Sequence, residues 1–226
     1  MEISKLYKMI EEIGCLTFST INEKGEVHSR IAHFNGYDEE GLYFRTMVNK
    51  PYFRQLVNTG KLTVCGMTDS RVLDHNDDGT PVFPLSYVIR LIGDIRKVSD
   101  DVIIEKAKTN KMLVTATQDM EKYPSMKGAN FVMHKFKGEI FDTDFEMVNR
   151  DHKLYRERFS FGGVEFNNPG PRINELCIEC GKCKDVCSFF AIEEGSPYKV
   201  IHNKCDDCGM CLLSCPVDAI EESLEF

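Results

Sequence analysis

Eight of the ten cysteines lie in the last quarter of this chain, and they fall into two copies of one spacing. Each copy reads C-x2-C-x2-C-x3-C, and the second copy follows the first after 28 residues. Three thiolates from one short loop suit one face of a four-iron cluster, so the fourth ligand must come from elsewhere. Zinc usually takes two pairs of ligands separated by a longer arm, and disulfides are typical of secreted proteins. The spacing therefore favours two [4Fe–4S] clusters over zinc or disulfides.

This repeated run resembles the bacterial-type ferredoxins that hold two [4Fe–4S] clusters, in which the last cysteine of each run binds the other cluster. We therefore expect the first cluster to be held by Cys177, Cys180, Cys183 and Cys215, and the second by Cys205, Cys208, Cys211 and Cys187. The first run departs from the family pattern at Ser188, where the second run has Pro216. This departure leaves every ligand in place.

The charge is distributed as unevenly as the cysteines. The chain carries a net charge of −8, and residues 173–226, with 4 Lys+Arg and 11 Asp+Glu, account for −7 of it. Nucleic-acid binders normally present a basic face, so we expect no nucleic-acid partner. No apolar run approaches the roughly 20 residues that cross a bilayer, and the first dozen residues do not resemble a signal peptide. We therefore expect a cytoplasmic protein with no membrane partner.

The elements that must position these groups are mostly short strands. Apolar residues at helical spacing predict a helix over residues 3–13, and further helices are expected over 49–58 and 101–110. Strands are expected over residues 15–20, 27–34, 42–46, 62–67, 87–98 and 130–141. Strands at such short spacing, with few and peripheral helices, predict a mainly antiparallel β-fold.

Residues 1–140 resemble the pyridoxamine 5′-phosphate oxidase-like split-barrel flavoproteins. The resemblance rests on the segment 25–30, the strand 42–46 and a lysine at the start of the next helix. In that family an arginine, a threonine and a lysine at these places hold the phosphate of FMN, which implies these roles for Arg30, Thr46 and Lys50. Helix N-termini and cationic side chains do suit a phosphate.

The resemblance leaves the roles of three further residues open. His28 and Ser29 either contact the flavin or its ribityl chain, or simply lie at a strand edge. Asn49 caps the helix, contacts the phosphate, or does both. Because the family builds its flavin sites between two subunits, the resemblance also implies a homodimer.

Together these features predict an α+β protein in three parts. Residues 1–141 form a mainly antiparallel β split barrel with peripheral helices that binds FMN. Residues 142–172 form a connector, and residues 173–226 form a small ferredoxin-like domain with two clusters. The connector contains the basic residues Arg150, Lys153, Arg156 and Arg158. It reads either as a solvated helix with a turn and linker, or as a segment that docks the acidic domain against the flavin domain.

Several other residues are expected to have structural roles only. Cys15 and Cys65 lie in apolar strands and are expected to be buried core thiols. Residues 74–79 begin like a calcium-binding loop, but the twelfth position is Leu85, so we expect a polar loop. No G-x-G-x-x-G segment is present, which argues against a resident nicotinamide cofactor.

A flavin exchanges one or two electrons, and a [4Fe–4S] cluster exchanges one. The sequence therefore predicts an oxidoreductase in which low-potential electrons from an external donor protein enter through the clusters, reach FMN and reduce a small organic substrate. The ferredoxin-like part implies an anaerobic setting. A non-catalytic electron-transfer adaptor and a flavin-binding sensor or storage protein are the alternatives, and no catalytic residue can be named beyond the flavin.

Overall fold

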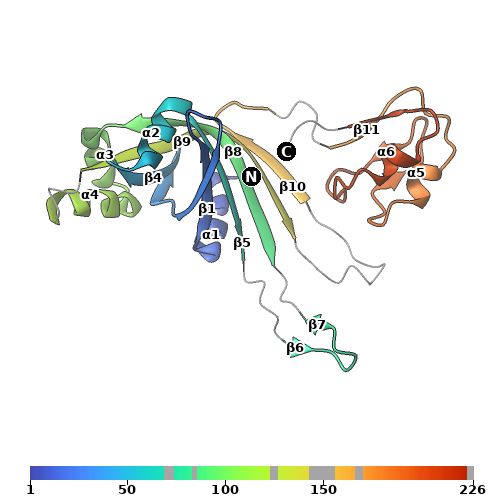
Figure 1. The fold of residues 1–226 in the computed structure, drawn as a ribbon, viewed down its shortest axis with the longest axis horizontal. Helices are drawn as coiled ribbons and strands as arrows, with labels where there is room; N and C mark the ends of the chain where they lie inside the picture. The colour runs from blue at the N-terminus through green and yellow to red at the C-terminus, as the bar shows by residue number, and fades with distance from the viewer. Residues whose placement is uncertain (69–73, 83–85, 123–126, 143–155, 166–169, 223–226) are drawn as a thin grey trace. The chain divides into compact units, whose positions relative to one another are not determined.

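The structure, a computed structural model, describes residues 1–68, 74–82, 86–122, 127–142, 156–165 and 170–222 (Figure 1). The chain separates into two compact units. The first comprises Met1–Thr68, Ile89–Gly138 and Phe159–Val164, and the second comprises Asp69–Val88, Glu139–Arg158 and Glu165–Phe226. The second unit thus contains all eight clustered cysteines. The limits 1–141, 142–172 and 173–226 remain a prediction.

Most of the first unit is one eight-stranded sheet with the order β2-β1-β5-β8-β9-β4-β3, in which β10 also pairs with β9. Its strands are β1 (Leu16–Ile21), β2 (Val27–Ala32), β3 (Gly36–Asp38), β4 (Gly41–Met47), β5 (Lys61–Met67), β8 (Tyr87–Val98), β9 (Gly128–Asp142) and β10 (Arg156–Phe161). The start of β8 up to Val88, the end of β9 from Glu139 and the start of β10 up to Arg158 are counted in the second unit. The pairs β1–β2, β1–β5, β3–β4 and β4–β9 are antiparallel. This mainly antiparallel sheet confirms the predicted fold class.

The core of the first unit covers both faces of β4. Phe18 on β1 and Val64 on β5 are fully buried register partners, as the two-residue alternation of strands requires. On β4 the neighbours Tyr43 and Phe44 are both buried. Phe44 stacks on Phe131 of β9 with ring centroids 5.5 Å apart, whereas Tyr43 packs in a separate apolar cluster. Packing from both sides fixes β4 and the polar residues at its end.

Few helices accompany the sheet, and they lie at its margins (Figure 1). They are α1 (Ile3–Ile13), α2 (Pro51–Thr59), α3 (Asp100–Ala107), the short 3-10 turn η1 (Lys111–Leu113) and α4 (Val114–Lys122). Helix α2 starts at a proline, whose fixed φ suits a first turn, and ends at Thr59, where Gly60 with φ +61° caps it. Helix α4 was not predicted, because its sequence VTATQDMEK has no apolar period of 3.6 residues.

The second unit contains several short elements besides the ends of the strands of the large sheet. These short elements are the hairpin β6 (Asp74–His75) and β7 (Pro81–Val82), β11 (Arg172–Ile173), α5 (Lys182–Asp185), β12 (Ile192–Glu193), β13 (Lys199–Val200), α6 (Met210–Ser214) and β14 (Ile220–Glu221). Strand β11 pairs with β14 and β12 with β13, both antiparallel. The buried side chains of Ile173, Ile192 and Ile220 form its small apolar core with cysteine side chains.

The basic run of the predicted connector is not helical where the structure describes it. Arg156 and Arg158 belong to strand β10, so the predicted solvated helix is wrong there. The aromatic residues that follow explain the strand, because Phe159 is buried and Phe161 stacks on Phe136 with centroids 5.1 Å apart. Arg150 and Lys153 lie outside the described residues, and the docking role of the connector stays a prediction.

The two remaining cysteines are not core thiols. Both Cys15 and Cys65 are exposed, which corrects the prediction of burial. On β5 the buried positions are Leu62 and Val64, so the alternation of the strand places Cys65 on the opposite face. Among the residues that the structure describes, no helix combines the length and apolar character needed to cross a membrane.

Candidate functional site

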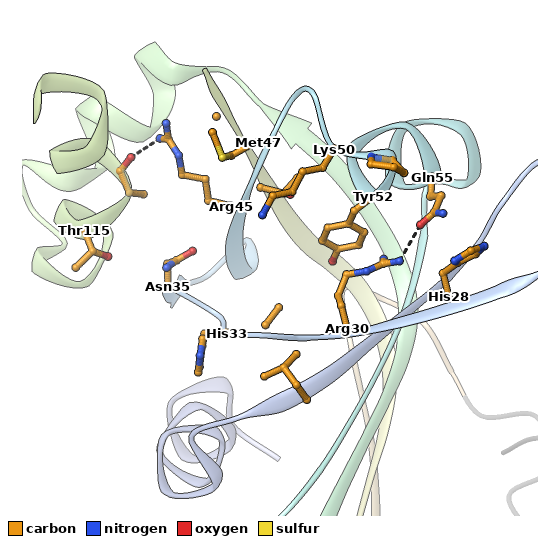
Figure 2. Close-up of a pocket in the computed structure, with 16 residues that line it drawn as sticks. His28, Arg30, His33, Asn35, Arg45, Met47, Lys50, Tyr52, Gln55 and Thr115 are labelled. Atoms are coloured by element: carbon orange, nitrogen blue, oxygen red, sulfur yellow. Dashed lines mark hydrogen bonds between the residues drawn. The ribbon is translucent and has the colours of Figure 1, made fainter. Parts of the chain in front are cut away.

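A cavity of about 740 Å³ in the first unit gathers most of the residues predicted to bind a phosphate (Figure 2). His28 and Arg30 of β2, Thr46 of β4 and Lys50 at the start of α2 all line it. Its size is within the range of ordinary cofactor pockets. Four of the six predicted residues are therefore brought together by β2, β4 and α2.

Ser29 and Asn49 are not among the residues that line this cavity. Ser29 lies on the other face of β2, where its hydroxyl is 2.8 Å from that of Ser19. Asn49 is exposed in the turn before α2, and Lys50 is the N-cap residue of that helix. No side chain caps α2, and its first turn offers few free donors, because Pro51 has no N–H and the N–H of Phe53 donates to the Lys50 carbonyl over 3.1 Å.

The Arg30 guanidinium is held in place by three residues around it. Its Nη1 donates to Thr20 Oγ1 over 3.0 Å and its Nη2 donates to Gln55 Oε1 over 2.9 Å. Its Cζ lies 4.0 Å from the centroid of the Tyr52 ring. Burial lowers the pKa of this guanidinium from its ordinary value. A guanidinium has more N–H donors than these contacts use, so Arg30 offers a fixed cation to the cavity.

The sequence did not point to several other residues that line the cavity: His33, Asn35, Arg45, Tyr52, Gln55 and Thr115. Figure 2 shows Arg45, Asn35 and Thr115 on the side of the cavity opposite His28. Arg45 Nη1 donates to the backbone oxygen of Ala116 over 2.5 Å. Tyr52 and Gln55 could have been predicted from the sequence, because residues three positions apart lie on the same face of a helix, here the helix that follows Lys50. Thr115 could not, because α4 was not predicted.

In the second unit, the two cysteine runs share one backbone geometry. Among its described residues, four other than glycine have positive φ, which is uncommon. Glu179 and Asp207 both have φ 59°, and Phe190 and Asp218 both have φ 51°. Within each pair the positions match between the two runs, so the sequence repeat is also a repeat in space.

One small cavity of the second unit is lined by the predicted first ligand set. Cys177, Cys180 and Cys183 of the first run lie there together with Cys215 of the second run. The other lining residues are mostly apolar and include Ile173. Four thiols from two runs around one apolar cavity suit a sulfur-ligated iron cluster.

The predicted second ligand set is also drawn together by the fold. Burial raises the pKa of the Cys211 thiol, and the neighbouring Cys208 and Cys187 raise it further. Burial is also the main cause that raises the pKa of Cys205 to about 12, and Cys211 contributes to that shift. Cys187 and Cys211 also pack against the same apolar core of the second unit.

Backbone N–H groups point at four of these sulfur atoms in a repeated pattern. The bonds run from Glu179 to Cys177 (3.4 Å), Ala191 to Cys187 (3.3 Å), Asp207 to Cys205 (3.4 Å) and Ala219 to Cys215 (3.2 Å). Hydrogen bonds to sulfur favour the thiolate and influence the potential of a bound cluster. The residues present therefore fit two four-iron clusters.

Comparison with known proteins bears on this second unit directly. A family model for a 4Fe–4S binding domain matches residues 198–221, and a second model for a 4Fe–4S binding domain matches residues 174–189. Residues 174–221 form an iron–sulfur region. No curated protein matches the chain.

Several solved structures are similar to the chain. A NimC/NimA family protein from Clostridium acetobutylicum is 20% identical, with 70% of this chain and 93% of that chain covered and a TM-score of 0.47. A putative 5-nitroimidazole antibiotic resistance protein from Bacteroides thetaiotaomicron is 12% identical, with 62% and 85% covered and a TM-score of 0.43. HutZ, the heme storage protein from Vibrio cholerae, is 13% identical, with 59% and 90% covered and a TM-score of 0.40. At such low identities nothing about activity transfers.

Proposed function

We propose that this chain is an FMN- and iron–sulfur-dependent oxidoreductase that passes low-potential electrons from two [4Fe–4S] clusters to FMN and reduces a small organic substrate. The observation that carries the proposal is the presence, in one chain, of the iron–sulfur region and of a cavity with a cationic, phosphate-compatible side. When bound, a flavin supplies the exchange between one-electron carriers and two-electron chemistry.

Three residues would hold the flavin phosphate. Lys50 supplies a point charge at the start of α2, where the helix dipole also favours an anion. Arg30 adds a charge-assisted contact from β2, and the Thr46 hydroxyl adds a neutral one from β4. The Tyr52 ring lies 4.0 Å from Arg30 Cζ and helps to orient that guanidinium toward the ligand.

The opposite side of the cavity would receive the substrate. Asn35, Arg45 and Thr115 line this side and offer N–H and O–H donors of different strength. The Arg45 guanidinium is oriented by its bond to the Ala116 carbonyl, so its position does not depend on the ligand. These residues would bind and orient a small polar substrate. The catalytic proton donor is not assigned.

Substrate-dependent turnover separates this function from its main alternative, a non-catalytic electron-transfer adaptor. The full chain, loaded anaerobically with iron, sulfide and FMN, is reduced with dithionite and then mixed with panels of small oxidised compounds. An oxidoreductase should reoxidise its flavin many times faster with one class of compound than with the others. An adaptor should respond to protein acceptors alone.

Replacing the cationic residues should weaken flavin binding. We expect Lys50→Ala and Arg30→Ala each to cost roughly 1.5–3 kcal/mol of FMN binding, because each removes a charge-assisted contact to phosphate. Ser29→Ala is the matched control on the same strand, since Ser29 faces away from the cavity and should leave affinity unchanged. Fluorescence titration with FMN measures all three. Unchanged affinity in both cationic variants would place the flavin elsewhere.

We also infer that the chain forms a homodimer through the face of β2. This edge strand leaves Val27 71% exposed and Ile31 64% exposed, and Ile31 also lines the cavity. A second subunit on this face would bury these apolar side chains and narrow the cavity.

The solution mass should therefore be twice the 25.9 kDa of one chain. Ile31→Lys should give monomers and release flavin, whereas Ile92→Lys, at another exposed isoleucine on β8, should do neither. Size-exclusion chromatography with light scattering measures the solution mass of the wild type and of both variants. A flavin-loaded protein of one-chain mass would contradict the dimer.

A further inference from the structure

Glu179 and Asp207 occupy the same position in the two cysteine runs. Both have φ 59°, and each donates its backbone N–H over 3.4 Å to the sulfur of the first cysteine of its run, Cys177 or Cys205. The backbones of the two loops are therefore alike. A difference between the two cluster sites must come from the side chains around these matched positions.

The surroundings of the two carboxylates differ strongly. Glu179 is exposed, and its Oε1 accepts a hydrogen bond from the Ser196 hydroxyl. Asp207 Oδ2 instead accepts from both Arg156 and Arg158, whose side chains are only 5% and 7% exposed. One cluster loop thus has a solvated carboxylate, and the other has a carboxylate clamped by two buried guanidinium groups.

The two arginines are fixed by further contacts within the second unit. The fully buried Glu139 places Oε2 3.5 Å from Arg158 Nε and 3.7 Å from Arg156 Nη1. The backbone N–H of Arg156 donates to the carbonyl of Asn203, over 2.9 Å, just before the second run. Because buried charges are costly unless they are paired, these contacts hold the four charged groups in one arrangement.

We propose that Arg156 and Arg158 are positioning residues that, through Asp207, set the reduction potential of the second cluster independently of the first. This inference rests on the proposed two-cluster site. On taking one electron from a donor, a bound cluster gains one negative charge, with no bond formed or broken. A fixed nearby cation favours that reduced form and a fixed anion opposes it, and the effect is strong where water is excluded.

The test compares single substitutions in the full, cluster-loaded chain. Both midpoint potentials are measured by a dithionite titration with mediators, followed by electron paramagnetic resonance. Asp207→Asn removes an anion and leaves both arginines, so one midpoint potential should rise by at least about 59 mV. This shift equals a tenfold change in the equilibrium constant for one-electron reduction. Arg158→Gln should lower the same midpoint, and Arg158→Lys should restore most of it.

Glu179→Gln is the matched control in the other loop. It should move the other midpoint, and by less, because solvent screens an exposed carboxylate. Unchanged midpoints in Asp207→Asn with both clusters loaded would overturn the inference, as would equal shifts of one midpoint in Asp207→Asn and Glu179→Gln. If Asp207→Asn loses iron, Arg158→Gln tests the inference alone: a lowered midpoint potential supports it, and an unchanged or raised one overturns it. A wild-type chain that binds no iron–sulfur cluster would instead refute the proposed function.

Discussion

Replacing Cys187 with serine should abolish the cluster held by the second cysteine run and leave the cluster of its own run intact. Iron should fall from about eight to about four atoms per chain, because each cluster needs four thiolates. The expectation follows from the fold, which places Cys187 beside the Cys211 thiol and brings Cys215 to the cavity of the first run. Cys215→Ser should correspondingly remove the first cluster.

Double substitutions make this test independent of any spectral assignment. Cys187→Ser combined with Cys208→Ser affects a single cluster if the ligands cross, so about four iron atoms should remain. Cys187→Ser combined with Cys180→Ser affects both clusters, so iron should be lost almost completely. Iron and sulfide analysis of anaerobically purified protein measures both. The reverse pattern would show that each run binds its own cluster, and zinc in place of iron would refute the clusters themselves.

Electron delivery to the flavin should depend on the iron–sulfur region and on salt. Residues 173–226 carry a side-chain charge of −7, and two oxidised clusters with four thiolates each add about −4. Such a charge attracts a donor with a basic face and can accelerate the encounter by roughly 10–10³-fold at low ionic strength. The donor-dependent step should therefore slow steeply as salt rises past about 0.1 M, where the Debye length is about 10 Å.

Transfer between clusters and flavin within one chain is tethered, so its rate should barely change across the same salt series. Rapid mixing with a protein donor resolves the two steps. The control is a chain with Cys180→Ser and Cys208→Ser, whose flavin should still be reduced by light with a chemical donor but no longer by the protein donor. A salt-independent donor step, or equal reduction of this variant by the protein donor, would show that electrons enter elsewhere.

The sequence was most informative where one local pattern determines structure. The cysteine spacing predicted the iron–sulfur region, because cluster ligands must come from short loops at fixed intervals. The strong apolar period of residues 3–13 likewise predicted α1 with its observed bounds. Arg30, Thr46 and Lys50, which line the cavity, were named from the resemblance to the split-barrel flavoproteins, whose phosphate motif they match.

Features that depend on contacts far apart in the chain were missed. From the sequence, Arg156 and Arg158 looked like part of a solvated basic run. In the structure both belong to β10, are buried and pair with acidic residues at positions 139 and 207. Asn35 and Thr115 reach the cavity from segments that the motif does not include. Cys65 was misassigned although β5 alternates in sequence, because it shares a face with Lys61 whereas Leu62 and Val64 form the buried face.

The exposure of Cys15 and Cys65 also has an analytical consequence. These two thiols are accessible on the first unit, whereas the other eight cysteines would be occupied as cluster ligands. A thiol-reactive dye therefore counts cluster loading directly, since the loaded chain offers two reactive groups and the unloaded, unfolded chain offers ten. The number of labels on each chain is read from the mass of the intact labelled protein. Serine at both positions would lower the background to zero and turn every added label into a missing iron ligand.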